Sequence, residues 1–381
     1  MSGGISAARY AERLLRARAA VAEAGASALL VGVGPELEWL TGYAAHGGER
    51  LDLLVIPAVG PAAFVSPRLE APAALAAPGF AEGRLTVHTW EETDDPFLLV
   101  PPLVPPKAPR RLLVSDGLRA AFVLGLQGVL PGADWGLASS VLSPLRRVKD
   151  ADEIALLRAA ARAADEAIER IIGGPLVGRT EADVAKDVRD ALVAAGHDTA
   201  EFWIVASGPN SASPHHEPGD RVIGPGEPLL LDIGGRRAGY NSDITRTVWI
   251  AGEDGAGPEP GFSEIYRLTA SAQAAARAAV RPGLTFEALD AVAREVIAAG
   301  GYGARFIHRL GHGIGLEVHE EPYVVAGNAD VVVPGNTFSC EPGIYLEGRY
   351  GVRIEDAMVC TAEGGDSLNE APRELRIVPG R

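Results

Sequence analysis

Residues 229–249 read LLLDIGGRRAGYNSDITRTVW, a run in which two aspartates stand among apolar, strand-forming residues. The run begins as an apolar strand that carries Asp232, and after a glycine-containing turn it continues as a second strand beside Asp243. Strands joined by a turn of this length pair antiparallel, which can bring the two aspartates side by side. The run therefore predicts a β-hairpin that carries a pair of carboxylates.

A related arrangement occurs later in the chain, where residues 338–356 read FSCEPGIYLEGRYGVRIED. Glu341 and Glu355 stand here in the places of the two aspartates, and each hairpin follows a Pro-Gly pair. Each hairpin is also preceded by a helical stretch, 180–196 or 285–301, which starts with threonine and ends at glycine. Chance could explain any single shared feature, but their common order favours a duplicated unit of helix and β-hairpin.

The four carboxylates predict a metal site. Carboxylates buried at close range repel one another unless a cation lies between them. A single acid at the end of a strand is usually a turn or cap residue, but four in a duplicated arrangement favour a pair of divalent ions. Oxygen ligands with one imidazole suit Mn²⁺ best, and Co²⁺, Fe²⁺ and Zn²⁺ are compatible alternatives.

Histidines supply the remaining candidates. In HRLGHGIGLEVHE, residues 308–320, glycines flank His312 on both sides and allow the backbone to approach the site closely. The spacing of these glycines does not match a nucleotide-binding fingerprint. In GPNSASPHH, residues 208–216, the composition predicts a loop. This loop is either an exposed turn or a segment that delivers His215 as a hydrogen-bond donor to a developing oxyanion.

Composition excludes several other classes of protein. The chain has 381 residues, with 35 lysines and arginines against 50 acidic residues and a net charge of -15. This balance argues against a nucleic-acid binder and against a polybasic membrane anchor. Two cysteines exclude a disulfide framework and a thiolate zinc site, and no apolar run is long enough for a membrane-spanning helix. We therefore expect a soluble, cytoplasmic protein.

The length predicts two or three domains. Residues 148–173 read as a helix with a capping box formed by Asp150 and Glu153, and we place a domain boundary just before it. The expected domains are therefore 1–147, a small α/β domain without a chemical signature, and 148–381, which carries the chemistry.

These motifs resemble those of the metallopeptidases of the pita-bread fold. Residues 148–378 are most similar to Xaa-Pro dipeptidases (prolidases) and Xaa-Pro aminopeptidases through LLLDIGG, YNSDITRT, HRLGHGIGLEVHE, SCEPGIY and GVRIED. The N-terminal region resembles the creatinase-type domain of this family through WLTGY, residues 39–43. The resemblance implies an α+β protein: a C-terminal pita-bread domain of duplicated helix and β-hairpin units on a curved antiparallel sheet, and a smaller N-terminal α/β creatinase-type domain.

The resemblance also assigns site residues. It implies that two divalent metal ions are held by five ligands: Asp232, Asp243, His312, Glu341 and Glu355. Asp243 and Glu355 would bridge the ions, and Glu341 would also carry a proton to the leaving group.

Further residues of the same motifs are expected around the metals. The resemblance implies that His215 and His319 line the substrate pocket and stabilise the tetrahedral intermediate, although His216 competes with His215 for this place. His308 would contact the substrate. Arg353 and Tyr240 would orient the ligand carboxylates, Arg353 as part of the catalytic group and Tyr240 beside the substrate.

The resemblance implies hydrolysis of the Xaa-Pro bond in dipeptides or short peptides by a metal-bridging hydroxide, in a homodimer. One alternative is a hydrolase of another small amide, and a second is a binding protein on an inactive scaffold, although all five ligands are present. The choice between dipeptidase and aminopeptidase depends on a cation for the substrate carboxylate, supplied by Arg353 or by an arginine of the N-terminal domain.

Overall fold

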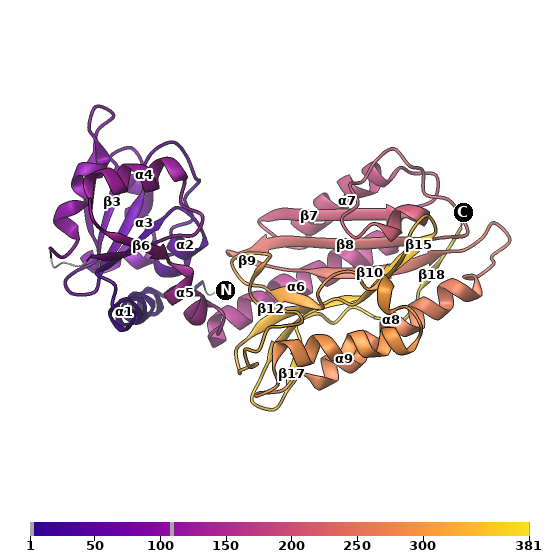
Figure 1. The fold of residues 1–381 in the computed structure, drawn as a ribbon. Coiled ribbons are helices and arrows are strands. Elements are labelled where there is room, and N and C mark those ends of the chain that lie inside the picture. The colour runs from indigo at the N-terminus through magenta and orange to yellow at the C-terminus, as the bar shows by residue number, and fades with distance from the viewer. Residues whose placement is uncertain (1–3, 107–109, 381) are drawn as a thin grey trace. The chain divides into compact units, whose positions relative to one another are not determined.

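The computed structural model describes residues 4–106 and 110–380, and it divides into two compact units, Met1–Arg146 and Arg147–Arg381. Both units combine helices with a sheet (Figure 1). Among the described residues, none of the helices is both long and apolar enough to cross a membrane.

The first unit is built on a mixed sheet with the strand order β4-β3-β2-β1-β5-β6. Its strands are β1 (Ala28–Gly32), β2 (Leu53–Pro57), β3 (Ala63–Pro67), β4 (Thr86–Trp90), β5 (Arg111–Val114) and β6 (Asp134–Leu137). Its helices are α1 (Ala7–Glu23), α2 (Pro35–Thr41), α3 (Ala71–Ala76), α4 (Ala120–Val129) and α5 (Ser139–Arg146), with short 3-10 turns η1 (Pro78–Gly83), η2 (Pro96–Leu99) and η3 (Pro101–Leu103). Strands β1 and β2 are buried along their whole length, as apolar runs that pack on both faces require.

The second unit is built on a larger sheet with the strand order β12-β11-β13-β16-β10-β8-β7, which is antiparallel along this path. Its strands are β7 (Thr199–Ser207), β8 (Glu227–Arg237), β9 (Tyr240–Asn241), β10 (Ile244–Ile250), β11 (Gly311–Gly313), β12 (Glu320–Val324), β13 (Thr337–Cys340), β14 (Gly343–Leu346), β15 (Tyr350–Arg353), β16 (Glu355–Cys360), β17 (Gly365–Ser367) and β18 (Ile377–Val378). Its helices are α6 (Ala151–Ile172), α7 (Glu181–Ala194), α8 (Pro260–Ala279) and α9 (Phe286–Ala299), with 3-10 turns η4 (Gly208–Ala212) and η5 (Gly303–Arg305).

The second unit consists of two similar halves that meet at the β10–β16 pair. On one side of this pair lie β8 and β7, and on the other lie β13 and β11. Helices α6 and α7 pack against the β7–β8 side, whereas α8 and α9 pack together against the other side (Figure 1). Each half buries its own apolar core beneath its strands.

The duplication extends to single residues. Thr180 accepts a hydrogen bond from the third backbone N–H of α7, and Thr285 does the same for α9. Thr180 also pairs with Val222 in an isolated antiparallel bridge, and Thr285 pairs with Val331 in the same way. This shared geometry confirms the predicted duplicated unit.

The second hairpin differs from the prediction. Strands β13 and β16 pair directly, but the chain between them forms its own two-stranded ribbon, β14 and β15. The reason is an additional tight turn at residues 347–349, where Gly348 adopts the left-handed conformation that favours glycine. The predicted boundary helix is confirmed as α6, in which Asp150 and Glu153 form the expected capping box.

Candidate metal centre

The first half of the unit supplies two carboxylates to one pocket. Asp232 lies within β8, and Asp243 directly precedes β10. Thr245 of β10 lies opposite Asp232 on one side and opposite Glu355 of β16 on the other, so these three residues form a row across the sheet. Because side chains alternate faces along a strand, Asp243 shares a face with this row.

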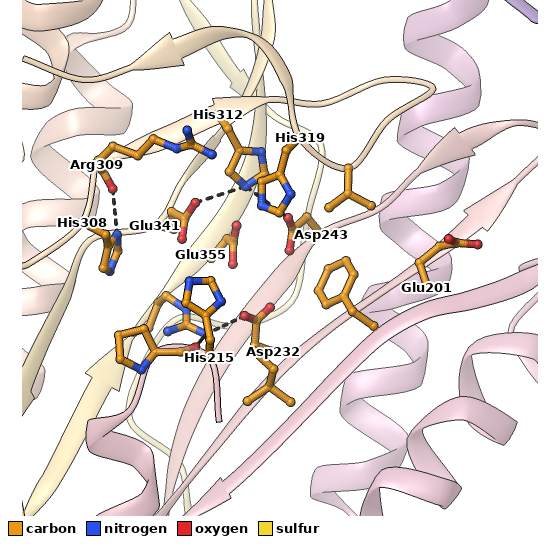
Figure 2. Close-up of a pocket in the computed structure, with 15 residues that line it drawn as sticks. Glu201, His215, Asp232, Asp243, His308, Arg309, His312, His319, Glu341 and Glu355 are labelled. Atoms are coloured by element: carbon orange, nitrogen blue, oxygen red, sulfur yellow. Dashed lines mark hydrogen bonds and ion pairs between the residues drawn. The ribbon is translucent and has the colours of Figure 1, made fainter. Parts of the chain in front are cut away.

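The second half supplies the remaining candidates. Glu355 opens β16, Glu341 directly follows β13, and His312 is the central residue of β11. His312 Nε2 lies 3.2 Å from Glu341 Oε1 and 3.6 Å from Asp243 Oδ2. Figure 2 shows the four carboxylates and His312 directed toward a common space.

Gly311 and Gly313 allow this approach. A Cβ atom at Gly311 would collide with the backbone carbonyl of Ser339, and one at Gly313 would lie 2.5 Å from the backbone of Glu321. His312 is therefore held between two strands at a distance that only glycine neighbours permit.

The donor set fits divalent metal ions. A ligand atom from each of Asp243, His312 and Glu355 lies within 4.8 Å of the others, and all three residues are buried. Asp232 Oδ1 and Glu355 Oε1 are buried without a hydrogen-bond partner among the described residues. Buried oxygens without a partner are costly unless a cation neutralises them, so these atoms have the character of ligands.

Electrostatic repulsion leads to the same conclusion. Burial, followed by the charges of Asp232 and Glu341, raises the pKa of Asp243 well above its ordinary value. Burial, followed by the charges of Asp243, Glu341 and Asp232, has the same effect on the pKa of Glu355. These carboxylates repel one another when ionised. A cation placed among them would offset this repulsion and stabilise their charged forms.

The neighbouring acid Asp356 is excluded as a ligand by the alternation of the strand. Arg246 Nη2 lies 2.9 Å from Asp356 Oδ1, and Arg373 Nε donates to Oδ2 over 2.5 Å. These arginines neutralise Asp356 on the opposite face of β16, so only Glu355 faces the pocket.

The pocket has a volume of about 600 Å³, which suits a small ligand. Part of its wall is apolar, formed by Phe202, Ile204, Pro214 and Val318. The five predicted ligands line the same pocket together with His215, His308, Arg309, His319 and Arg353.

The two adjacent histidines of the 208–216 loop point to different places. His215 lines the pocket, whereas His216 lies with Nε2 2.7 Å from Glu181 Oε2. Glu181 is fully buried and also accepts hydrogen bonds from the backbone N–H and the hydroxyl of Ser207, each over 2.7 Å. The geometry therefore gives His215, rather than His216, access to the site.

His308 and Arg353 belong to one hydrogen-bond chain. His308 Nδ1 donates to the carbonyl of Arg309 over 2.8 Å, so Nε2 of the neutral ring accepts from the hydroxyl of Tyr345 over 2.9 Å. Burial lowers the pKa of His308, which keeps the ring neutral. Arg353 Nη1 donates to Tyr345 over 2.8 Å, and Nη2 lies 2.5 Å from Asp232 Oδ2.

His319 lies beside His312, with 4.1 Å between the ring centroids. Burial, together with the charges of His312 and Arg309, lowers the pKa of His319 to about 4. At neutral pH this ring is therefore uncharged and can both donate and accept a hydrogen bond.

Tyr240 does not take the place that the sequence predicts. Its side chain is buried outside the pocket lining, and its hydroxyl donates to Glu153 of α6 over 2.8 Å. The predicted substrate contact is therefore not supported. The physical reason is that β9 packs against α6. The Tyr240 ring therefore links the sheet to this helix instead of facing the pocket.

Three residues that act on the site were not predicted. Thr245 donates to Glu355 Oε2 over 2.6 Å and accepts from Arg353 Nε over 3.1 Å. Its position two residues after Asp243, on the same strand face, was a usable signal. Tyr345 and Glu181 gave no such signal, because His308 lies 37 positions from Tyr345 and Ser207 lies 26 positions from Glu181.

Comparison with known proteins identifies the family. Residues 13–148 match the creatinase/prolidase N-terminal domain, and residues 155–362 match metallopeptidase family M24. The chain is 47% identical over 374 residues to the probable dipeptidase PepE of Mycobacterium tuberculosis, covering 97% of both chains. It is 36% identical over 353 residues to the Xaa-Pro dipeptidase of Lactobacillus helveticus, covering 91% of this chain and 93% of the relative.

Solved structures agree with these sequence matches. The dipeptidase PepE from Mycobacterium ulcerans superposes with a TM-score of 0.92 at 43% identity, covering 99% of this chain and all of the other. The recombinant prolidase from Thermococcus sibiricus superposes with a TM-score of 0.90 at 34% identity, with the same coverage. The predicted resemblance and fold class are confirmed, and the chain belongs to metallopeptidase family M24, with a creatinase/prolidase N-terminal domain.

Proposed function

We propose that this metallopeptidase hydrolyses the peptide bond before proline in Xaa-Pro dipeptides or short peptides, using two divalent metal ions. The observation that carries the proposal is the convergence of four carboxylates and one histidine on a single pocket, with two buried carboxylate oxygens that lack a hydrogen-bond partner among the described residues. The relatives named Xaa-Pro dipeptidase and prolidase support the choice of substrate.

Five side chains would hold the ions: Asp232, Asp243, His312, Glu341 and Glu355. When bound, such ions supply a water of lowered pKa and polarise the substrate carbonyl. The predominance of oxygen ligands favours Mn²⁺, with Co²⁺, Fe²⁺ and Zn²⁺ as compatible alternatives.

The remaining residues of the pocket would orient and protonate the substrate. Glu341 would carry a proton to the departing proline nitrogen, since its carboxylate is among the described groups that face the pocket. The neutral ring of His319 would hydrogen-bond the substrate, and His215 would donate to the oxygen of the attacked carbonyl. His308 would contact the substrate through the carbon edge of its ring, because both of its nitrogens are already hydrogen-bonded. Arg353 would hold Asp232 and Thr245 in position rather than react.

Selectivity for proline would come from the apolar wall. Phe202, Ile204, Pro214 and Val318 present carbon surface that suits a pyrrolidine ring. A secondary amide at the same place would bring a polar N–H against this surface, which disfavours its binding.

The test is hydrolysis of Ala-Pro by the purified chain loaded with Mn²⁺, compared with Ala-Ala and with protein stripped of metal by a chelator. We expect cleavage of Ala-Pro to exceed that of Ala-Ala and to require the metal. Metal-loaded protein that cleaves no Xaa-Pro peptide would refute the proposal, and faster cleavage of Ala-Ala would refute the selectivity for proline.

We further propose that the protein is a homodimer, as its resemblance to the family implies, and that it is cytoplasmic, as its composition and its two cysteines suggest. Light scattering of the purified chain tests the oligomeric state, and a monomer at micromolar concentration would contradict it.

A further inference from the structure

Two arginines line the pocket, and they differ in what their guanidinium groups contact. All three nitrogens of Arg353 are engaged: Nε donates to Thr245, Nη1 to Tyr345, and Nη2 to Asp232 and to the carbonyl of Pro214. Arg353 is also buried, with an exposed fraction of 3%. These bonds use four of its five N–H groups, so the one N–H left on Nη1 cannot form the paired contact that a carboxylate favours.

Arg309 is available where Arg353 is not. Among the described residues its side chain makes no ion pair, although it lines the pocket and is half-buried. Its guanidinium carbon lies 4.4 Å from the centroid of the Tyr323 ring. Tyr323 pairs with His312 across β11 and β12, so the stacked arginine is tied to the strand that carries the candidate metal ligand.

Stacking prepares Arg309 to bind an anion. A guanidinium that lies over an aromatic ring is restrained in position, while the N–H groups at its edge remain free to donate. Figure 2 shows the side chain extending from the backbone beside His308 toward the pair of His312 and His319.

The chemistry of the substrate provides that anion. In a dipeptide, the residue after the scissile bond carries the free α-carboxylate, whereas in a longer peptide the same position is a neutral amide. A guanidinium pairs with a carboxylate through two parallel hydrogen bonds, which is stronger and more directional than its contact with an amide oxygen.

We propose that Arg309 binds the α-carboxylate of the residue that follows the scissile bond, and thereby makes the enzyme prefer dipeptides to longer peptides. This inference rests on the proposed Xaa-Pro hydrolysis. It assigns the recognition of chain length to a residue other than Arg353.

The test compares Ala-Pro with Ala-prolinamide, which differ only in the carboxylate, on Mn²⁺-loaded wild type, Arg309→Gln and Arg309→Lys. We expect the ratio of kcat/KM for the acid to that for the amide to fall by about tenfold to a hundredfold in Arg309→Gln, chiefly through KM for the acid. Arg309→Lys keeps the charge and should recover part of this ratio. Arg305→Gln, at an exposed arginine outside the pocket lining, is the matched control and should keep the wild-type ratio.

The outcomes separate this inference from the proposed function. Wild type that cleaves neither compound refutes the proposed hydrolysis. Wild type that cleaves them, with an unchanged acid-to-amide ratio in Arg309→Gln, refutes only the role of Arg309. An equal loss for both compounds also refutes it, because it would place Arg309 on a group that the two compounds share. Thermal unfolding of Arg309→Gln shows whether loss of stacking on Tyr323 has disturbed the fold.

Discussion

Glu181 Oε2 lies 2.7 Å from His216 Nε2, so the histidine next to His215 is anchored away from the pocket. Glu181 also accepts from Asn210 Nδ2 over 3.0 Å, and Ser207 donates to it from both backbone and side chain. Burial alone would raise the pKa of Glu181, but the hydrogen bonds from Ser207 and His216 lower it overall. One buried carboxylate thus fixes the loop that carries His215.

Loss of this anchor should slow turnover without removing metal. In His216→Ala we expect kcat for Ala-Pro to fall by about tenfold or more, because small displacements of a catalytic group are costly. His216→Gln retains a donor that can reach Glu181 and should recover part of the rate. Metal content should stay at the wild-type level in both variants, and a wild-type kcat in His216→Ala would contradict the positioning role.

Substitution of a candidate ligand should abolish metal binding and catalysis together. Asp243→Asn and Glu355→Gln each remove one charge from the carboxylate cluster and should abolish both metal loading and Ala-Pro hydrolysis. Metal content by mass spectrometry and turnover are measured on the same samples. Asp366→Asn, in an exposed ion pair with Arg158, is the control. Full turnover in either ligand variant would overturn the assignment.

Removing only one partner of the Lys149–Glu320 ion pair should destabilise the folded protein. The two groups lie 2.6 Å apart and are almost completely buried. Lys149→Met leaves the Glu320 charge without its cation and should lower the free energy of unfolding by about 3–5 kcal/mol. The double variant with Glu320→Gln should recover most of this loss, as urea unfolding would show. Equal stability of the single and double variants would argue against a coupled pair.

Asp52 in the first unit should make stability depend on pH. Burial, opposed by a hydrogen bond from Ser66 and assisted by the charge of Glu70, raises the pKa of Asp52 to about 6. In the unfolded chain the pKa is about 3.9, so between these values the folded state binds more protons. The contribution to stability is therefore present below about pH 4 and is lost as pH rises through about 6.

Asp52→Asn removes this dependence. Relative to wild type, the variant should gain stability between about pH 4 and pH 7, whereas Glu23→Gln at the exposed end of α1 should not. Calorimetric unfolding at the two pH values measures the difference. A gap between Asp52→Asn and wild type that stays constant with pH would contradict a raised pKa.

The sequence predicted those parts of the fold that depend on local pattern. The α6 helix follows from a capping box and an apolar stripe, and the duplicated helices follow from threonine caps that the structure confirms. The ribbon of β14 and β15 was missed because its turn lies between β13 and β16. The sequence between these two strands was interpreted as a single hairpin loop.

The sequence predicted the site residues that belong to the repeated carboxylate hairpins. It did not predict contacts between residues that are far apart in the sequence. Asp243 and Glu355 stand at equivalent points of two similar hairpins, and so do Asp232 and Glu341, so the repeated pattern alone indicates one shared site. The network around Glu181 joins residues up to 38 positions apart, and Tyr240 meets Glu153 across 87 positions. Neither periodicity nor a motif reports such contacts, which is why the substrate contact predicted for Tyr240 was not supported.

The meeting of the two halves at β10 and β16 has a consequence for affinity. Each half contributes two of the four carboxylates. A half on its own could therefore complete the cluster only by associating with a second copy of itself. In the joined chain that association is intramolecular, and its effective concentration is set by the tether instead of by the amount of protein. Assembly of the ligand set should therefore not depend on protein concentration, and the four carboxylates should act together within a single chain.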